Sequence, residues 1–125
     1  MGNKMRKILI VDDQAEVREL VEITLKSDQY QIIQAENGEE AIEIVNKAKP
    51  DLILMDIMMH GNIDGLEATR RLKSNPETKD SFIIMLTAKG QKGDYEKGFD
   101  SGADDYFVKP FSPLELINKV EEILK

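Results

Sequence analysis

Short apolar runs alternate along the chain with stretches in which apolar residues recur every three or four positions. Apolar runs of this length predict buried strands, and the longer periodic stretches predict amphipathic helices. The predicted strands cover residues 7–11, 31–35, 51–56, 82–87 and 105–109. The predicted helices cover about residues 15–26, 38–49, 64–73, 91–101 and 112–125. Strands and helices therefore alternate from one end of the chain to the other.

Capping signals mark the start of three predicted helices. A side chain that can accept an N–H hydrogen bond precedes each helix, and a glutamate follows three positions later. The three pairs are Asn37 and Glu40, Asp64 and Glu67, and Ser112 and Glu115. The fourth helical segment lacks such a signal and contains Gly98, which costs about 1 kcal/mol relative to alanine in a helix.

Strands that are apolar on both faces and alternate with helices are typical of a parallel sheet covered on both sides. Right-handed crossovers leave few topologies, of which we expect the doubly wound, flavodoxin-like order 2-1-3-4-5. The predicted fold class is therefore α/β with a five-stranded parallel sheet. We expect a single domain over residues 1–125, in which residues 1–5 form a flexible tail.

Composition narrows the range of partners. The 125 residues carry a formal net charge of -7 and include no cysteine. An acidic protein is a poor partner for nucleic acid or an anionic membrane, and the lack of cysteine excludes disulfides and thiol chemistry. The apolar runs are too short for a signal peptide or a membrane span. We therefore expect no direct nucleic-acid binding, no membrane insertion and a cytoplasmic location.

Polar residues stand at the carboxyl ends of the predicted strands. Asp12 and Asp13 follow the first strand, Asp56 ends the third, Thr87 ends the fourth and Lys109 ends the fifth. In the predicted sheet order these side chains meet at one edge, where α/β sheets bind ligands. Three carboxylates within about 5 Å would repel one another by about 3 kcal/mol per pair, which calls for a cation. Oxygen ligands favour Mg²⁺.

The same set of groups suits phosphoryl transfer. A cation, a lysine and a hydroxyl can clamp a phosphoryl group, and a carboxylate can act as the nucleophile. A nucleotide- or flavin-binding protein of flavodoxin-like fold is an alternative, but "VDDQAEV" offers two negative charges where such proteins place a phosphate-binding loop. An aspartyl phosphatase is a second alternative, although it would need a substrate-binding cap.

Four motifs in order along the chain carry a family resemblance. "ILIVDD", "DLILMDIMM", "MLTA" and "DDYFVKPF" together resemble the receiver domain of bacterial two-component response regulators. The resemblance covers essentially the whole chain. It implies a phosphorylation-activated switch in a two-component system or phosphorelay, which is not an enzyme acting on an external substrate.

The resemblance also implies roles for individual residues. Asp56 would accept the phosphoryl group from phosphohistidine. Asp12 and Asp13 would hold Mg²⁺ together with Asp56 and the backbone carbonyl of Met58. Thr87 would bind a phosphoryl oxygen.

Further residues would couple phosphorylation to a change of shape. Lys109 would neutralise phosphoryl charge, and the peptide bond before Pro110 would be cis. Tyr106 matches the family's aromatic switch position, which would turn inward as Thr87 moves toward the phosphoryl group. The surface formed by the fourth helix, fifth strand and fifth helix would then change.

Two departures from the family pattern affect the loop after Asp56. His60 stands where many receivers have proline, and "MMHGNIDG" is one residue longer than usual. We expect His60 to be a solvent-facing loop residue rather than a phosphoryl relay or metal ligand. Met58 and Lys89 match positions that tune the lifetime of the phosphoryl group in the family.

The expected partners follow from this resemblance. The phosphoryl donor would be a sensor histidine kinase or a histidine phosphotransfer protein, and the output would pass to a downstream protein. We expect a stand-alone receiver that is a monomer or a phosphorylation-dependent dimer. A pseudo-receiver that only binds partners is the alternative within the family.

Overall fold

The computed structural model describes residues 5–88 and 100–125 of the chain. Its strands form one parallel sheet in the order β2-β1-β3-β4-β5, which confirms the predicted topology. The strands are β1 (Arg6–Val11), β2 (Tyr30–Ala35), β3 (Leu52–Asp56), β4 (Phe82–Ala88) and β5 (Asp105–Lys109). The helices are α1 (Ala15–Leu25), α2 (Gly38–Ala48), α3 (Gly65–Ser74) and α5 (Pro113–Leu124). The helix predicted over residues 91–101 lies almost wholly outside the described residues.

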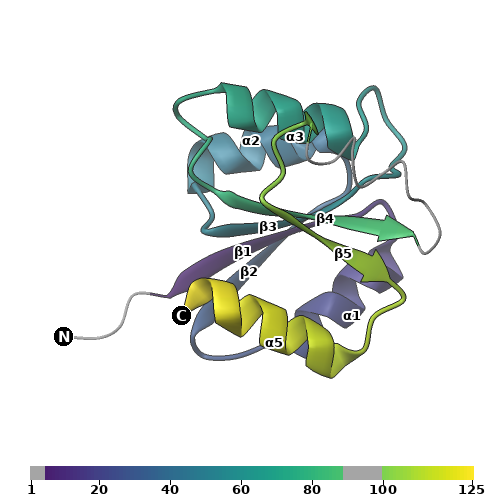
Figure 1. The fold of residues 1–125 in the computed structure, drawn as a ribbon, viewed down its shortest axis with the longest axis vertical. Coiled ribbons are helices and arrows are strands. Elements are labelled where there is room, and N and C mark those ends of the chain that lie inside the picture. Colours follow the sequence, from purple (N-terminus) through teal and green to yellow (C-terminus); the bar gives the residue numbers. More distant parts are fainter. Residues whose placement is uncertain (1–4, 89–99) are drawn as a thin grey trace.

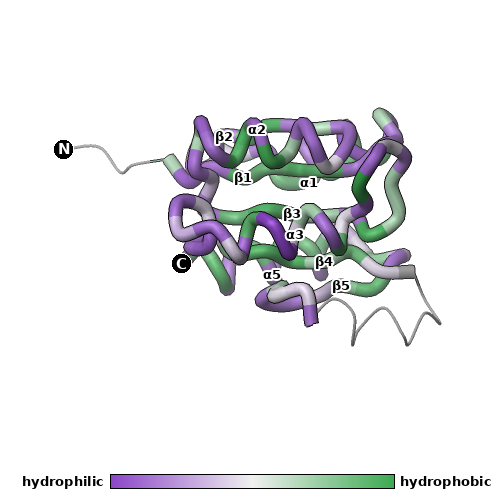
Figure 2. Tube along the Cα trace, turned by 90° about the horizontal axis from the view of Figure 1, so that it is seen from above, coloured by the Kyte–Doolittle hydropathy of each residue, from purple (hydrophilic) through white to green (hydrophobic). Residues whose placement is uncertain are grey.

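Helices cover both faces of the sheet: α2 and α3 lie on one side, and α1 and α5 on the other (Figure 1). Alternate residues of the central strands supply the two cores, so that Leu9 faces α2 and α3 while Ile8 faces α1 and α5. In Figure 2 the central strands are coloured hydrophobic along most of their length, whereas α2 and α3 alternate between the two colours. The central strands contribute side chains to both cores and are therefore continuous apolar runs. Each helix packs against only one core, so that its apolar residues are periodic.

The three predicted helix caps are present. The Asn37, Asp64 and Ser112 side chains each accept a hydrogen bond from the backbone N–H of the glutamate three residues later. At Ser112 the Glu115 carboxylate also accepts from the Ser112 N–H, which completes a capping box. These contacts fix the first turns of α2, α3 and α5.

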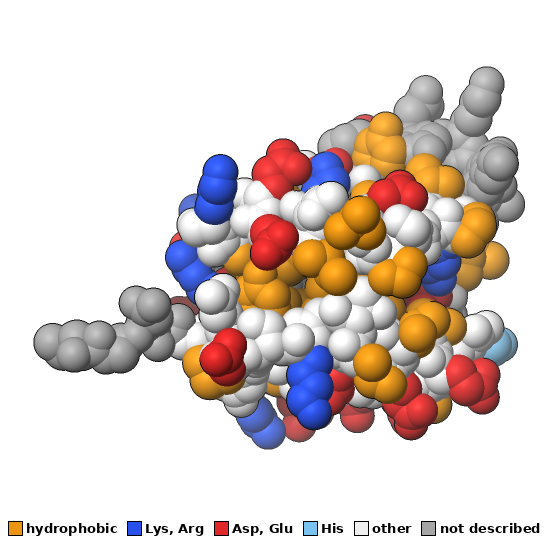
Figure 3. Space-filling view, turned by 90° about the horizontal axis from the view of Figure 1, so that it is seen from below, with side chains coloured by type: hydrophobic (Ala, Val, Ile, Leu, Met, Phe, Trp, Pro, Cys, Tyr) orange, Lys and Arg blue, Asp and Glu red, His pale blue; other side chains and the backbone are white. Residues whose placement is uncertain are grey.

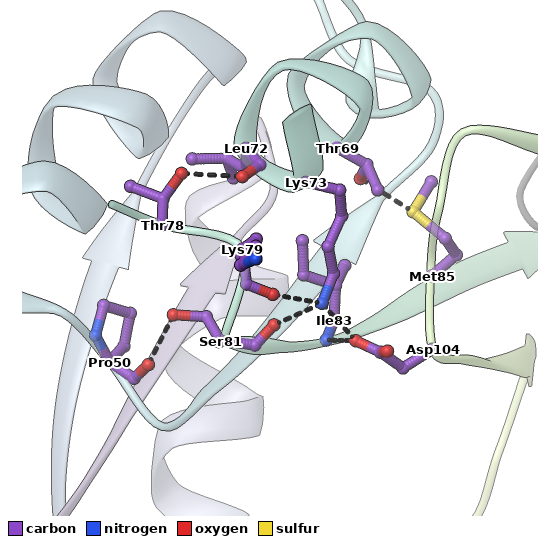
Figure 4. Close-up of polar contacts among 10 residues, drawn as sticks. All are labelled: Pro50, Thr69, Leu72, Lys73, Thr78, Lys79, Ser81, Ile83, Met85 and Asp104. Atoms are coloured by element: carbon purple, nitrogen blue, oxygen red, sulfur yellow. Dashed lines mark hydrogen bonds and ion pairs between the residues drawn. The ribbon is translucent and has the colours of Figure 1, made fainter. Parts of the chain in front are cut away.

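A polar network lies between the last turn of α3 and the start of β4 (Figure 4). Lys73 points from the last turn of α3, and its Nζ donates to the carbonyls of Lys79 and Ser81 at 2.9 and 2.7 Å and pairs with Asp104 at 2.6 Å. Asp104 also accepts from the Ile83 N–H at 2.9 Å. The network thus joins α3, the start of β4 and the segment that leads into β5.

The face covered by α1 and α5 carries apolar side chains among charged ones (Figure 3). Leu20 and Ile23 of α1 are 63% and 71% exposed, and Leu114 of α5 is 65% exposed. Within the part of the chain that the structure describes, no helix has the length and apolar character needed to cross a membrane.

Candidate functional site

The carboxyl ends of four strands bring the predicted site residues together. Asp12 and Asp13 directly follow β1, and Asp56 is the last residue of the neighbouring strand β3. Thr87 lies near the end of β4, and Lys109 ends β5, where it is the register partner of Ala88. Because neighbouring strands are parallel and in register, all five side chains lie at one edge of the sheet.

The three carboxylates form a compact acidic cluster. Each of Asp12, Asp13 and Asp56 offers an oxygen atom that lies within 4.8 Å of those of the other two. Asp12 and Asp56 are buried, at 1% and 7% exposure, so little water screens their charges. This set of hard oxygen donors fits a divalent cation such as Mg²⁺.

Lys109 lies between two of these carboxylates and makes a long ion pair with each. Its Nζ is 3.3 Å from Asp56 Oδ1 and 3.5 Å from Asp12 Oδ2. Asp12 also accepts a hydrogen bond from the Gln14 N–H at 2.9 Å. One ammonium group shared by two carboxylates leaves the cluster with excess negative charge, because Asp13 adds a third carboxylate.

Burial raises the pKa of Asp56 to about 6. Loss of water around the carboxylate is the main cause. The Lys109 charge opposes this rise, and the nearby Asp12 charge adds to it. The Met58 N–H also donates to Asp56 and favours the ionised form. A bound cation would stabilise the ionised form further, and that form is the one able to act as a nucleophile.

Thr87 presents a buried hydroxyl that lacks a partner. The residue is 1% exposed, and its Oγ1 makes no hydrogen bond with any described residue. Buried hydroxyls are normally hydrogen-bonded, because desolvation without a partner costs about 1–3 kcal/mol. An orphaned donor beside the acidic cluster fits a site that receives an anionic oxygen.

The structure also locates the remaining predicted residues. Tyr106 is partly buried and packs against the core on the side of α2 and α3. Met58 is 74% exposed, and the peptide bond between Lys109 and Pro110 is cis. Lys89 lies outside the described residues.

His60 makes a contact that the sequence did not reveal. Its side chain is 98% exposed, which agrees with a solvent-facing loop residue. However, its Nδ1 lies 2.5 Å from Asp13 Oδ2, and its backbone N–H donates to the same oxygen at 3.1 Å. Burial raises the pKa of Asp13, but these hydrogen bonds outweigh it and leave that pKa below its usual value. The loop after β3 therefore contacts the acidic cluster.

Gly65 is a second residue that was not predicted. A Cβ at this position would lie 2.0 Å from the backbone oxygen of Asp56, which no side chain could tolerate. The Gly65 N–H donates to the Ile57 carbonyl at 3.0 Å, so α3 starts directly against the end of β3. A glycine immediately after the cap residue Asp64 was the available sequence signal.

Comparisons with known proteins agree with the fold. The family model for the response regulator receiver domain matches residues 8–121. The chain is 48% identical over 119 residues to the transcriptional regulatory protein ResD of Bacillus subtilis, covering 95% of this chain and 48% of ResD. It is 45% identical over 120 residues to the phosphate regulon regulator PhoB of Pseudomonas aeruginosa, covering 96% of this chain and 52% of PhoB.

A solved structure gives the same result over a full-length match. The Vibrio cholerae chemotaxis protein CheY4 superimposes with a TM-score of 0.87 at 31% identity, covering 96% of this chain and 99% of that one. The chain spans about half the length of the curated relatives described above. On this evidence, the chain belongs to the response regulator receiver domain family of two-component signalling systems.

Proposed function

We propose that this receiver is a switch that is activated when Asp56 accepts a phosphoryl group from a phosphohistidine. The observation that carries the proposal is the arrangement around Asp56. A buried carboxylate lies beside Asp12 and Asp13, with Lys109 at 3.3 Å and the unpartnered hydroxyl of Thr87 at the same edge. Lys109 balances only part of the negative charge of this arrangement, so that a bound cation would complete it.

Asp12, Asp13 and Asp56 would hold Mg²⁺ through their carboxylates, together with the backbone carbonyl of Met58. When bound, Mg²⁺ supplies Lewis-acid stabilisation of charge on the phosphoryl oxygens. Asp12 and Asp13 follow a different strand and would supply ligands of their own. Asp56 would therefore not have to hold the cation alone and could still react.

In the transfer step this chain supplies the nucleophile and the groups that stabilise charge. An Asp56 carboxylate oxygen forms a bond to phosphorus as the bond from phosphorus to the donor imidazole nitrogen breaks, and the imidazole leaves with the electron pair. Lys109 stabilises the added negative charge. The Thr87 hydroxyl donates to a phosphoryl oxygen and gains the hydrogen bond that it lacks.

The signal would leave through β5 and α5, with the helix predicted over residues 91–101. Tyr106 in β5 would turn inward as Thr87 moves toward the phosphoryl group. Asp105, next to it, already pairs with Lys119 of α5 at 3.1 Å, so β5 and α5 are linked by charge as well as by packing. A shift in β5 would therefore reach α5.

The phosphoryl donor would be a sensor histidine kinase or a histidine phosphotransfer protein. The exposed Leu20 and Ile23 lie on α1, the helix that starts just after the Asp12 and Asp13 pair. They offer apolar contact area for such a protein along the helix that begins at the reactive end of the sheet. The output partner would be a protein, and the active form a monomer or a phosphorylation-dependent dimer.

Intact-mass spectrometry after incubation with acetyl phosphate tests the proposal. We expect one phosphoryl adduct in Mg²⁺, none in EDTA and none in Asp56→Asn. Lys109→Ala should still accept some phosphoryl but switch weakly. If neither acetyl phosphate nor a phosphorylated kinase domain gives an adduct, the protein is a pseudo-receiver and the proposal fails.

A further inference from the structure

We propose that His60 is a positioning residue, which holds the Asp13 carboxylate in the orientation that Mg²⁺ requires. This inference rests on the proposed magnesium site. His60 would not touch the cation: the carboxylates of Asp12, Asp13 and Asp56 form the cluster of donor atoms, and His60 contacts one oxygen of Asp13 from outside that cluster.

Asp13 is the member of the cluster that most needs an orienting contact. Asp12 is held by the Gln14 N–H and Lys109, and Asp56 is held by the Met58 N–H and Lys109. The side chain of Asp13 is 17% exposed, compared with 2% for Asp12 and 10% for Asp56. A more exposed carboxylate has more rotational freedom to lose when it binds a cation.

His60 supplies two hydrogen-bond donors to the same oxygen of Asp13. The backbone N–H lies 3.1 Å from Oδ2, and Nδ1 lies 2.5 Å from it. In this contact Nδ1 carries the proton, because an ionised carboxylate only accepts. Both donors lie on Oδ2, so that Oδ1 receives neither of them and stays available to a cation. Hydrogen bonds on the far oxygen of a ligand are a common way to fix its orientation.

The loop holds His60 in place from both sides. At its base, the Gly65 N–H donates to the Ile57 carbonyl at 3.0 Å. After His60, Gly61 has a φ of +124°, a conformation that favours glycine, and the Asn62 N–H then donates to the Glu39 carboxylate of α2 at 3.2 Å. These contacts fix the backbone around His60. The exposed His60 side chain is therefore attached at a defined position from which it contacts Asp13.

The donor position can be tested by matched substitutions at residue 60. In His60→Asn the amide nitrogen can take the place of Nδ1, so the contact can survive. In His60→Gln the amide reaches the place of Nε2 instead, and in His60→Ala no side-chain donor remains. The backbone N–H is unchanged in all three variants, so that the comparison isolates the side chain.

Calorimetric titration of Mg²⁺ into each metal-free variant at pH 8 is the test. We expect the affinity to fall by about 3- to 10-fold in His60→Ala and His60→Gln, below the usual range for buried outer-sphere partners because His60 is exposed. His60→Asn should bind within about twofold of the wild type. Equal melting temperatures in EDTA would show that all variants fold.

Two results would overturn the inference: wild-type affinity or tighter binding in His60→Ala, or an Asn variant as weak as the Ala variant. Asp13→Asn serves as the control that loses the ligand itself. If the wild-type protein binds no Mg²⁺, the proposed magnesium site fails and the role of His60 fails with it. If the wild type binds and the variants match it, only the role of His60 fails.

Discussion

Lys73, which lies in α3 near the start of β4, and Lys109, which ends β5, have very different surroundings. Lys73 is 15% exposed, and three oxygen atoms surround its ammonium group at 2.6–2.9 Å. Lys109 is 32% exposed, and its two carboxylate neighbours lie at 3.3 and 3.5 Å. The first arrangement is complete in the folded chain. The second has more negative charge than the lysine can balance, and its geometry suits added ligands.

The threonines of the two regions differ in the same way. Thr78 is 2% exposed, and its hydroxyl donates to the Leu72 carbonyl at 2.6 Å. Thr87 is 1% exposed, but its hydroxyl has no partner among the described residues. Satisfied polar groups stabilise the fold, whereas unsatisfied ones mark a site that is finished only by a ligand.

Removal of each lysine should give the largest difference between the two regions. Lys73→Met leaves Asp104 without its cation, and we expect the free energy of unfolding to fall by about 3 kcal/mol. Lys109→Met should cost less, about 1–2 kcal/mol, because the lysine side chain is itself 32% exposed, its contacts are long, and Asp56, whose pKa is already about 6, can take up a proton when the cation is lost. Urea unfolding at pH 7.5 in EDTA measures both. A larger loss for Lys109→Met than for Lys73→Met would contradict the comparison.

Asp56→Asn tests how much the Asp56 charge lowers the free energy of unfolding. The folded-state pKa of Asp56, about 6, lies above its ordinary value of 3.8. The unfolded chain therefore releases this proton at lower pH, and the wild type loses stability as pH rises from about 4 to above 6. At pH 7.5 without metal we expect Asp56→Asn to be more stable by about 2 kcal/mol.

The pH dependence of the stability difference between Asp56→Asn and the wild type serves as the control. The advantage of Asp56→Asn should grow from pH 4 to 7 in urea unfolding experiments and should shrink when Mg²⁺ is added, because the cation stabilises the ionised wild type. An advantage that does not change with pH would show that the Asp56 charge is not the cause.

The smallest effect concerns the two threonines. Thr78→Val removes a made hydrogen bond and should cost about 1 kcal/mol. Thr87→Val removes a hydroxyl that has no partner among the described residues, so that we expect no loss, or a gain of up to about 1 kcal/mol. Thermal unfolding of the two variants gives the comparison. Equal destabilisation by both would mean that Thr87 is satisfied in the folded protein.

Much of the fold could be predicted because each element has a local cause. The apolar runs, the capping residues and the crossover rule were enough for the strand order and for the starts of α2, α3 and α5. Element ends were less accurate. β2 starts at Tyr30 and β4 ends at Ala88, because pairing with Arg6 of β1 and Lys109 of β5 extends each strand by one residue.

Contacts between distant loops could not be read from the sequence. The aspartates stand at strand ends, so that topology alone predicts where they meet. The contact of His60 with Asp13 depends instead on the path of an irregular loop, and the Lys73 network depends on how α3 meets the segment before β5. Neither follows from spacing or periodicity.

We propose that the excess negative charge at this end of the sheet allows Asp56 to accept a phosphoryl group with a bound cation. Borohydride reduction of protein treated with acetyl phosphate and Mg²⁺ converts an aspartyl phosphate to homoserine, which peptide mass spectrometry can locate. We expect homoserine at position 56, and none in EDTA. Homoserine at Asp12 or Asp13 instead, or at no position in protein that carries an adduct, would contradict it.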